Sequence, residues 1–96
     1  MSPKNKKKLD IIRKKLDTLD NKFLALIKTR TFLVNEVLKL KEFKSEIIDK
    51  KRINFILNKI KQKSKKLKID PKITNRIWKN MIWSYIDFER RNFKKK

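Results

Sequence analysis

The chain has 96 residues and a formal net charge of +20, from 30 lysines and arginines against 10 aspartates and glutamates. It contains no cysteine and no histidine, which excludes disulfide bridges, the usual zinc sites and Ser-His catalysis. Any reaction must therefore use arginine, lysine, carboxylate and hydroxyl side chains, together with the backbone.

The first predicted helix is very long. Neither glycine nor proline occurs between Lys4 and Asp70, so no residue there forces a helix to break. Apolar side chains follow a heptad spacing, which predicts one helix over about residues 7–43. The apolar residues of this seam are Leu9, Ile12, Leu16, Leu19, Phe23, Leu26, Leu33, Val37 and Leu40.

A helix of this length predicts that two chains associate. Residues 9–41 alone would extend about 50 Å, whereas a compact chain of 96 residues has a radius of gyration of about 12–13 Å. The rest of one chain cannot cover such a helix. We therefore predict an intertwined homodimer with a two-fold axis. Each chain should form one domain over residues 1–96, ordered from about 8 to 92 and flanked by basic tails.

Arg30 is the only charged residue of the seam. A buried cation can fix the register or oligomeric state of paired helices, and from this residue alone that alternative stays open. Lys41 follows 11 residues later, close to three turns, so we expect it on nearly the same face about 16 Å along the axis. Two such inward cations could hold a ring-sized dianion between them. Burying unpaired cations is costly, so a ligand or a carboxylate should be present there. Arg13, about 25 Å from Arg30 on the same helix, could join only from an antiparallel partner chain.

The segment KSEIIDKKR connects the first helix to a second one. Asp49 is suited to cap the N-terminus of that second helix, and Arg52 lies in its first turn. The basic segment KQKSKKLK, residues 61–68, leads out of it. An apolar stripe on this helix contains Ile53, Ile56, Leu57, Ile60 and Leu67.

The third helix has the clearest start, with Asp70 as the N-cap and Pro71 at the first helical position. Glu89 lies near its end, one turn beyond Tyr85, on a face that is otherwise apolar. Glu89 could form an ion pair with Arg13 or Lys41, could be exposed near a frayed end, or could act in a site. One face carries Ile73, Ile77, Met81 and Phe88, and the adjoining face carries Trp78, Ile82, Tyr85 and Glu89.

The whole pattern predicts an all-α fold with three helices and a frayed tail over residues 90–96. The positive charge fits a polyanion such as nucleic acid, but an A/T-rich genome would also produce many Lys, Ile and Asn codons. No apolar run approaches the length of a membrane span, and no apolar segment follows the basic N-terminus. We therefore predict a cytoplasmic protein.

These features together resemble the all-helical (AroQ-type) chorismate mutases. The resemblance runs from about Lys8 to Asn92, through LDIIRKKLDTLDNKFLALIKTRTFLVNEVLKLK, IIDKKR and IDPKITNRIWKNMIWSYIDFE. It implies an intertwined homodimer with two active sites that converts chorismate to prephenate in aromatic amino-acid biosynthesis. It also implies a small dianionic substrate and no metal or other cofactor. A basic helical dimer that binds nucleic acid through its exposed lysines remains a more distant alternative, and no membrane partner is expected.

The resemblance also implies roles for individual residues. Arg13 would enter the site from the partner chain. Arg30 and Arg52 would bind the carboxylates of the substrate. Lys41 would contact a carboxylate and the ether oxygen of the breaking bond, and Glu89 would make the other hydrogen bond to that oxygen. The reaction is pericyclic and needs no nucleophile, only a held conformer and stabilised charge.

Three further positions bear on which substrate is used. Asp49 would lie by the ring hydroxyl group. Ile53 stands where many family members have a glutamate that contacts this hydroxyl, and Tyr85 stands where a serine is common. The last two features also resemble a sister activity on the same fold, isochorismate pyruvate lyase, which releases salicylate and pyruvate. The lyase therefore remains the alternative activity.

Overall fold

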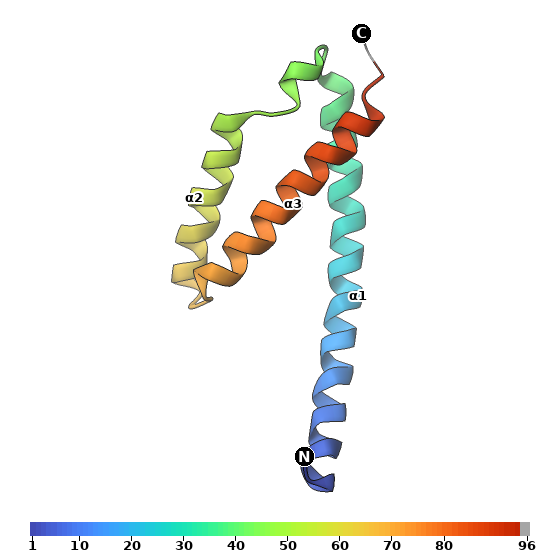
Figure 1. Cartoon of the computed structure of the whole chain (residues 1–96), viewed down its shortest axis with the longest axis vertical. Helices are drawn as coiled ribbons and strands as arrows, with labels where there is room; N and C mark the ends of the chain where they lie inside the picture. The colour runs from blue at the N-terminus through green and yellow to red at the C-terminus, as the bar shows by residue number, and fades with distance from the viewer. Residues whose placement is uncertain (95–96) are drawn as a thin grey trace. The chain divides into compact units, whose positions relative to one another are not determined.

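A computed structural model describes residues 1–94, so the end of the expected frayed tail lies outside the described residues. Its beginning was wrongly predicted, because residues 90–92 continue the third helix, which ends at Asn92. Three α-helices and one short 3-10 helix make up the described chain, which contains no strand (Figure 1). The elements are α1 (Pro3–Leu40), η1 (Lys44–Glu46), α2 (Lys50–Lys66) and α3 (Pro71–Asn92). The all-α prediction with one very long helix is thus confirmed. Among residues 1–94, none of the helices combines the length and the apolar composition of a membrane-spanning segment.

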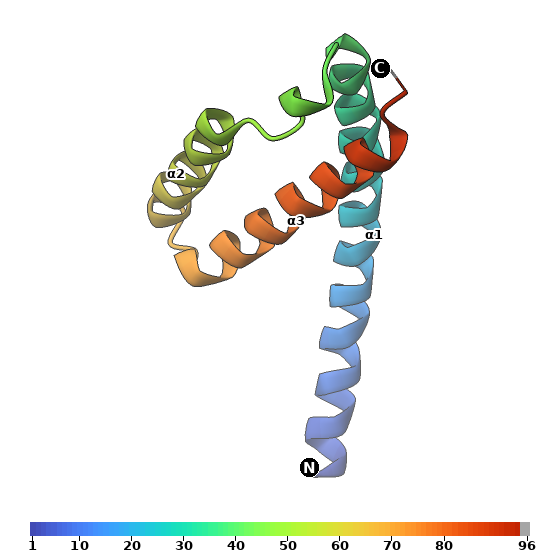
Figure 2. The same ribbon diagram turned by 45° about the horizontal axis from the view of Figure 1, so that its top comes forward.

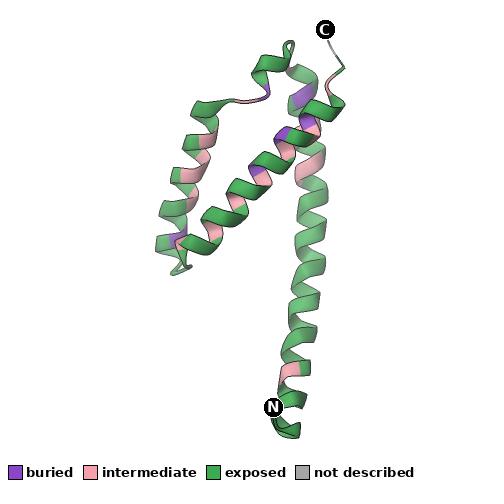
Figure 3. Ribbon diagram, viewed as in Figure 1, coloured by how far each residue is buried: buried purple, intermediate pink, exposed green. Residues whose placement is uncertain are grey.

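The chain divides into two compact units, Met1–Leu33 and Val34–Lys96. The N-terminal unit consists almost entirely of α1, and nearly all of its seam side chains are exposed, with green along this helix in Figure 3. Leu19 is 49% exposed and Leu26 66%. Soluble proteins rarely leave so long an apolar stripe uncovered.

The C-terminal unit has a small apolar core made by Leu38, Ile47, Ile82 and Ile86. Leu38 is the buried residue of α1, and it projects about 100° round the helix from the seam residue Val37. The end of α1 therefore packs within its own chain through one face and leaves the seam face exposed. Half-buried residues that pack against this core are Ile48, Ile53, Ile56, Leu57 and Phe93.

Helices α2 and α3 pack against each other and are joined by a tight turn (Figures 1 and 2). The predicted caps are present: Asp49 accepts from the Arg52 N–H at 3.0 Å, and Asp70 accepts from the Lys72 N–H at 2.9 Å. The predicted stripe of α2 is half-buried except for Leu67, which is 70% exposed. Including Leu67 was wrong, because α2 ends at Lys66 and Leu67 is its C-cap.

The expected C-terminal end of the first helix at Phe43 was also wrong, since α1 ends at Leu40. The carboxylate of Glu46 accepts hydrogen bonds from the backbone N–H groups of Glu42 and Phe43, at 2.7 and 2.8 Å. In a continuing helix those two groups would donate to carbonyls four residues earlier. Glu46 thus satisfies them outside the helix, and the chain turns into η1. Lys41 consequently lies just beyond α1, not on its face as we expected.

The helix α1 also begins earlier than expected, at Pro3 instead of about Lys7. The hydroxyl of Ser2 accepts from the Asn5 N–H at 3.2 Å, as an N-cap residue does. Proline suits the first helical position because its missing N–H has no partner there in any case. The additional turn therefore results from a local cap.

The turn after α2 forces Lys68 into the left-handed region, with φ 57°. The Ile69 N–H donates to the Ser64 carbonyl at 2.9 Å, and the Lys68 N–H donates to the Lys65 carbonyl at 3.2 Å. This is the Schellman arrangement, in which glycine is the usual residue at the left-handed position. The chain contains no glycine, so Lys68 holds a conformation that costs a side-chain-bearing residue about 1–2 kcal/mol.

Lys68→Gly should therefore stabilise the protein by about 1 kcal/mol, after part of the gain is offset by greater freedom of the unfolded chain. Urea unfolding at a fixed protein concentration measures this change. The matched control is Lys63→Gly in the interior of α2, which should destabilise by about 1 kcal/mol. Equal destabilisation by both variants would contradict the proposed strain at Lys68.

Candidate active site

An ion pair with both side chains largely buried joins Lys41 to Glu89. The Lys41 Nζ lies 3.1 Å from Oε2 and 3.3 Å from Oε1 of Glu89. The exposed side-chain fractions are 18% for Lys41 and 8% for Glu89. Of the alternatives left open for Glu89, the ion pair with Lys41 is thus present and exposure is excluded.

Local structure places both partners. Lys41 follows α1 directly, and its N–H donates to the Leu38 carbonyl at 3.1 Å, which closes the last turn of the helix. Glu89 lies in the last turns of α3, three residues after the core residue Ile86 and therefore on nearly the same face. The same apolar packing that holds Leu38 against Ile86 also brings these two charges together.

A hollow of about 510 Å³ opens beside Lys41. Its lining residues are Lys41, Glu46, Ile48, Asp49, Lys50 and Lys51. The sequence had indicated Lys41 and Asp49 for a site, and both line this one hollow. Asp49 uses one carboxylate oxygen to cap α2, and its second oxygen can still accept from a ligand hydroxyl.

Arg52 and Ile53 lie at the start of α2 with side chains in different surroundings. The Arg52 guanidinium lies over the ring of Phe55, with Cζ 5.3 Å from the ring centroid. Ile53 is half-buried and packs against the apolar core. The structure therefore places an aliphatic side chain, with no hydrogen-bonding group, at the position where a glutamate is common.

Tyr85 is half-buried on α3, one turn before Glu89. Its ring meets the Phe88 ring edge to face, with centroids 6.4 Å apart and an interplanar angle of 88°. Edge-to-face contact is one of the arrangements that aromatic pairs prefer. Tyr85 and Glu89 share one side of α3, as the spacing predicted.

Arg13 and Arg30 belong to the N-terminal unit. Arg13 is exposed, whereas Arg30 is half-buried with a buried Nε atom. Because both lie on the continuous helix α1 and are 17 residues apart, about 25 Å separates them along the axis. The two arginines of one chain therefore cannot contact the same small ligand. The sequence analysis had reached the same conclusion.

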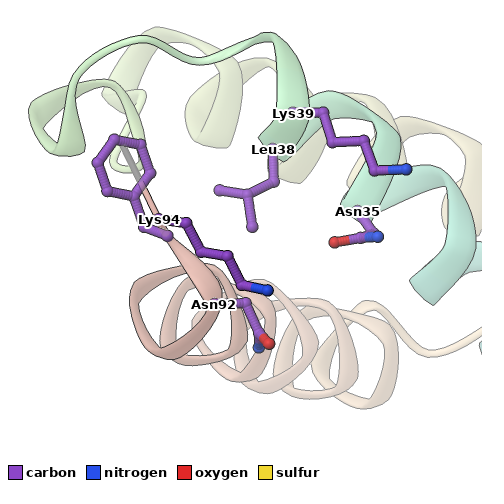
Figure 4. Close-up of a pocket in the computed structure, with 6 residues that line it drawn as sticks. Asn35, Leu38, Lys39, Asn92 and Lys94 are labelled. Atoms are coloured by element: carbon purple, nitrogen blue, oxygen red, sulfur yellow. The ribbon is translucent and has the colours of Figure 1, made fainter. Parts of the chain in front are cut away.

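The C-terminal unit has a second hollow, of about 350 Å³, next to the end of α3 (Figure 4). It is lined by Asn35, Leu38, Lys39, Asn92, Phe93 and Lys94. None of these residues was indicated by the sequence. The Lys39 ammonium is 3.3 Å from the exposed Glu36 carboxylate, so this hollow presents amide and lysine groups around Leu38.

Some residues beside Lys41 were missed in the sequence. Glu46 ends α1 through its carboxylate, and Ile48, Lys50 and Lys51 line the hollow beside Lys41 and Asp49. The signal for Glu46 was its spacing of three residues from Phe43, since a glutamate at that distance often accepts from a preceding N–H. No sequence signal distinguishes Lys50 or Lys51 from the other lysines.

The Lys41–Glu89 pair places an ammonium donor 3.1 Å from a carboxyl group, and both side chains are largely shielded from water. Such groups can hold and polarise an oxygen atom of a ligand, and they act more strongly where water is excluded. Residues 1–94 contain no group of three or more His, Cys, Asp or Glu arranged to hold a metal ion.

Comparisons with known proteins give a consistent result. The model of the family described as chorismate mutase type II matches residues 12–90. A protein of Methanocaldococcus jannaschii named chorismate mutase is 36% identical over 76 residues, which cover 78% of this chain and 77% of that protein. No solved structure shows a significant similarity to the chain.

Proposed function

Because the chain belongs to the type II chorismate mutase family, we propose that it rearranges chorismate to prephenate in aromatic amino-acid biosynthesis. The observation that supports this most directly is the buried contact between Lys41 and Glu89, 48 residues apart in sequence. By resemblance to the family, these are the two residues that contact the ether oxygen of the substrate. The Lys41 Nζ and the Glu89 Oε2 lie 3.1 Å apart, so both groups are close enough together to contact the same atom of a ligand.

The reaction breaks the C–O bond of the ether and forms a C–C bond within the same molecule. Negative charge grows on the ether oxygen as the C–O bond lengthens, so a fixed ammonium donor stabilises the transition state more than the ground state. In the proposed mechanism Lys41 supplies this donor. Glu89, when protonated, donates the second hydrogen bond.

The remaining roles follow the resemblance and the charges. Arg30 and Arg52 bind the substrate carboxylates, for which the two parallel donors of a guanidinium are suited. Arg52 leaves its place over Phe55 to do so, at a cost of about 1 kcal/mol or less for an exposed cation–π contact. Asp49 accepts from the ring hydroxyl, and Ile53 and Tyr85 form walls of the pocket.

We propose a homodimer in which Arg13 enters the site of the partner chain. The exposed seam of α1 supports this, because pairing two such helices would cover apolar residues that a single chain leaves in water. The exposed α3 residues Ile73 and Ile77, at 56% and 49%, offer further apolar surface for the same purpose.

The test is to incubate the purified protein with chorismate and, separately, with isochorismate. We expect chorismate to disappear with formation of prephenate, and little pyruvate from isochorismate. Faster pyruvate release than prephenate formation would assign the lyase activity instead, which Ile53 and Tyr85 resemble. Failure of both reactions would refute the proposed enzyme.

Glu89→Gln should retain mutase activity and should be more active than wild type wherever the wild-type carboxyl group is ionised. An ionised carboxylate cannot donate a hydrogen bond to an ether oxygen, whereas an amide donates at any pH. Profiles of kcat against pH for the two proteins measure the difference.

The matched control for this experiment is Asp87→Asn, which removes the same charge from the same helix. Asp87 is 67% exposed and pairs with Arg91 on the surface, so its replacement should leave the profile unchanged. If the profiles of Glu89→Gln and wild type coincide, Glu89 does not donate to the ether oxygen.

A further inference from the structure

The solvent-exposed surface of α2 and of the turn after it carries positive charge only. Between Asp49 and Asp70 the chain contains no aspartate or glutamate, and each cation of this stretch is exposed. None of them takes part in an ion pair within residues 1–94. These cations are Lys50, Lys51, Arg52, Lys59, Lys61, Lys63, Lys65, Lys66 and Lys68.

Two simpler explanations account for only part of this surface. Lysines in the last turn, such as Lys65 and Lys66, interact favourably with the partial negative charge at a helix C-terminus. Lysine-rich coding raises the number of lysines everywhere, but it does not remove carboxylates from one segment. The first half of α1 shows the contrast, because Asp10, Asp17 and Asp20 alternate there with lysines.

One face of α2 combines these charges with an exposed aromatic ring. Phe55 is 53% exposed, and its ring lies between Arg52 Cζ at 5.3 Å and Lys59 Nζ at 5.4 Å. Helical spacing places Lys63 and Lys66 on the same face. We call this face the α2 basic stripe; its residues are Phe55, Lys59, Lys63 and Lys66, and Arg52, to which the proposed function gives a part in substrate binding, is left out of it.

A shallow hollow of about 330 Å³ lies along the stripe. It is lined by Phe55, Asn58, Lys59 and Gln62. The ring gives a surface on which a planar group can stack, the lysine gives a cation, and the two amides can both donate and accept hydrogen bonds. These are the groups that proteins use to bind a nucleotide base next to its phosphate.

We propose that the α2 basic stripe binds a single-stranded polynucleotide, RNA or DNA. Lysines spaced along a helix of about 25 Å contact successive phosphates, and one unstacked base lies on Phe55 with its edge toward Asn58 or Gln62. In a duplex the bases stack on one another, so none is available to stack on the Phe55 ring. A lipid surface presents no base edge with which the amides of Asn58 and Gln62 could form hydrogen bonds. The stripe lies outside the hollow beside Lys41, so the inference does not depend on the proposed enzymatic function.

The test measures, by fluorescence anisotropy over a series of salt concentrations, the binding of a labelled oligonucleotide. The oligonucleotide has about 12 nucleotides, a length within the range of single-strand sites. The probes are oligo-U, oligo-dT, a DNA duplex of the same length, and vesicles of anionic phosphatidylglycerol. We expect oligo-U and oligo-dT to bind at about 50 mM salt and to dissociate steeply as salt rises. The comparison of oligo-U with oligo-dT decides between RNA and DNA.

The α2 variant carries Lys59→Gln, Lys63→Gln and Lys66→Gln together, and the matched control carries Lys4→Gln, Lys7→Gln and Lys8→Gln in α1. The α2 variant should bind the single-stranded oligonucleotides at least about 10-fold more weakly than wild type. Its slope of log K against log salt should be shallower by about 2, because each of the three lost phosphate contacts accounts for about 0.7. The control should lose less than about 3-fold. Chorismate turnover should be the same in both variants as in wild type, which also shows that they fold.

Phe55→Leu should weaken binding about 10-fold without changing the salt slope, because stacking involves no counterion release. Three results would each overturn the proposal. They are no binding at about 50 mM salt, equal loss in the α2 and control variants, and duplex or vesicle binding as tight as that of single strands.

Discussion

Replacement of Lys41 by alanine should lower kcat for chorismate about 100- to 1,000-fold, the usual effect of removing one donor to a developing oxyanion. The donor acts mainly in the transition state, so kcat and kcat/KM should fall together. Steady-state kinetics at saturating chorismate measure the change. An unchanged kcat would exclude Lys41 from the mechanism.

The same substitution also leaves Glu89 buried without its cation, which must be separated from the catalytic effect. Breaking a fully buried ion pair costs about 3–5 kcal/mol of stability, and less here because Lys41 is 18% exposed. Lys41→Met keeps the bulk of the side chain and should show the same loss of kcat. Circular dichroism and urea unfolding show whether each variant is folded during the assay.

The neighbouring residue Lys39 provides the control for this experiment. It lies two positions earlier, is 64% exposed and pairs with Glu36 on the surface. Such surface pairs contribute about 1 kcal/mol or less. Lys39→Ala should therefore keep wild-type kcat, and a comparable loss in this variant would mean that charge near the end of α1 acts nonspecifically.

Arg13→Ala and Arg30→Ala should each be nearly inactive as homodimers, yet a refolded mixture of the two should regain about a quarter of wild-type activity. In the proposed dimer every site needs Arg30 from one chain and Arg13 from the other. A heterodimer then has one site that lacks both arginines and one site that is whole. Random pairing makes about half of the dimers mixed, so about a quarter of all sites are intact.

The experiment requires that heterodimers form, which a mass tag on one variant and native mass spectrometry would establish. Each variant refolded alone is the control for activity lost in the procedure. The expected complementation follows from α1, since about 25 Å of helix separates Arg13 from Arg30 in one chain. If the heterodimers form and remain as inactive as their parents, Arg13 does not act across the interface.

Local features of the fold were predictable because they depend on neighbours in sequence. Asp49 and Asp70 cap helices α2 and α3 through N–H groups two or three residues away. The long heptad seam and the absence of glycine and proline from most of the chain predicted α1. Capping and helix propensity act within one or two turns, so a single sequence is enough to locate most of the helix starts.

The end of α1 was not predictable in the same way. Helical propensity and apolar spacing both favoured continuation to Phe43, but the Glu46 carboxylate took the N–H groups of Glu42 and Phe43. A side chain that folds back across a turn competes with the next helical hydrogen bond. This competition depends on where the following residues lie, and it moved Lys41 from the face of a helix into a turn.

The candidate site also has features that the sequence determines and features that only the tertiary structure determines. The sequence by itself determined which residue types were available: lysine, arginine and carboxylates, but no histidine or cysteine. It also indicated Lys41 and Glu89 as candidates, but it did not decide among three possible surroundings for Glu89. Only the tertiary structure decided that Glu89 is buried against Lys41, because a contact between residues 48 apart requires the chain to reverse twice and pack Leu38 against Ile86. Apolar burial is non-directional, so the sequence pattern says that these faces will be covered, and the packed structure alone determines which charges are enclosed with them.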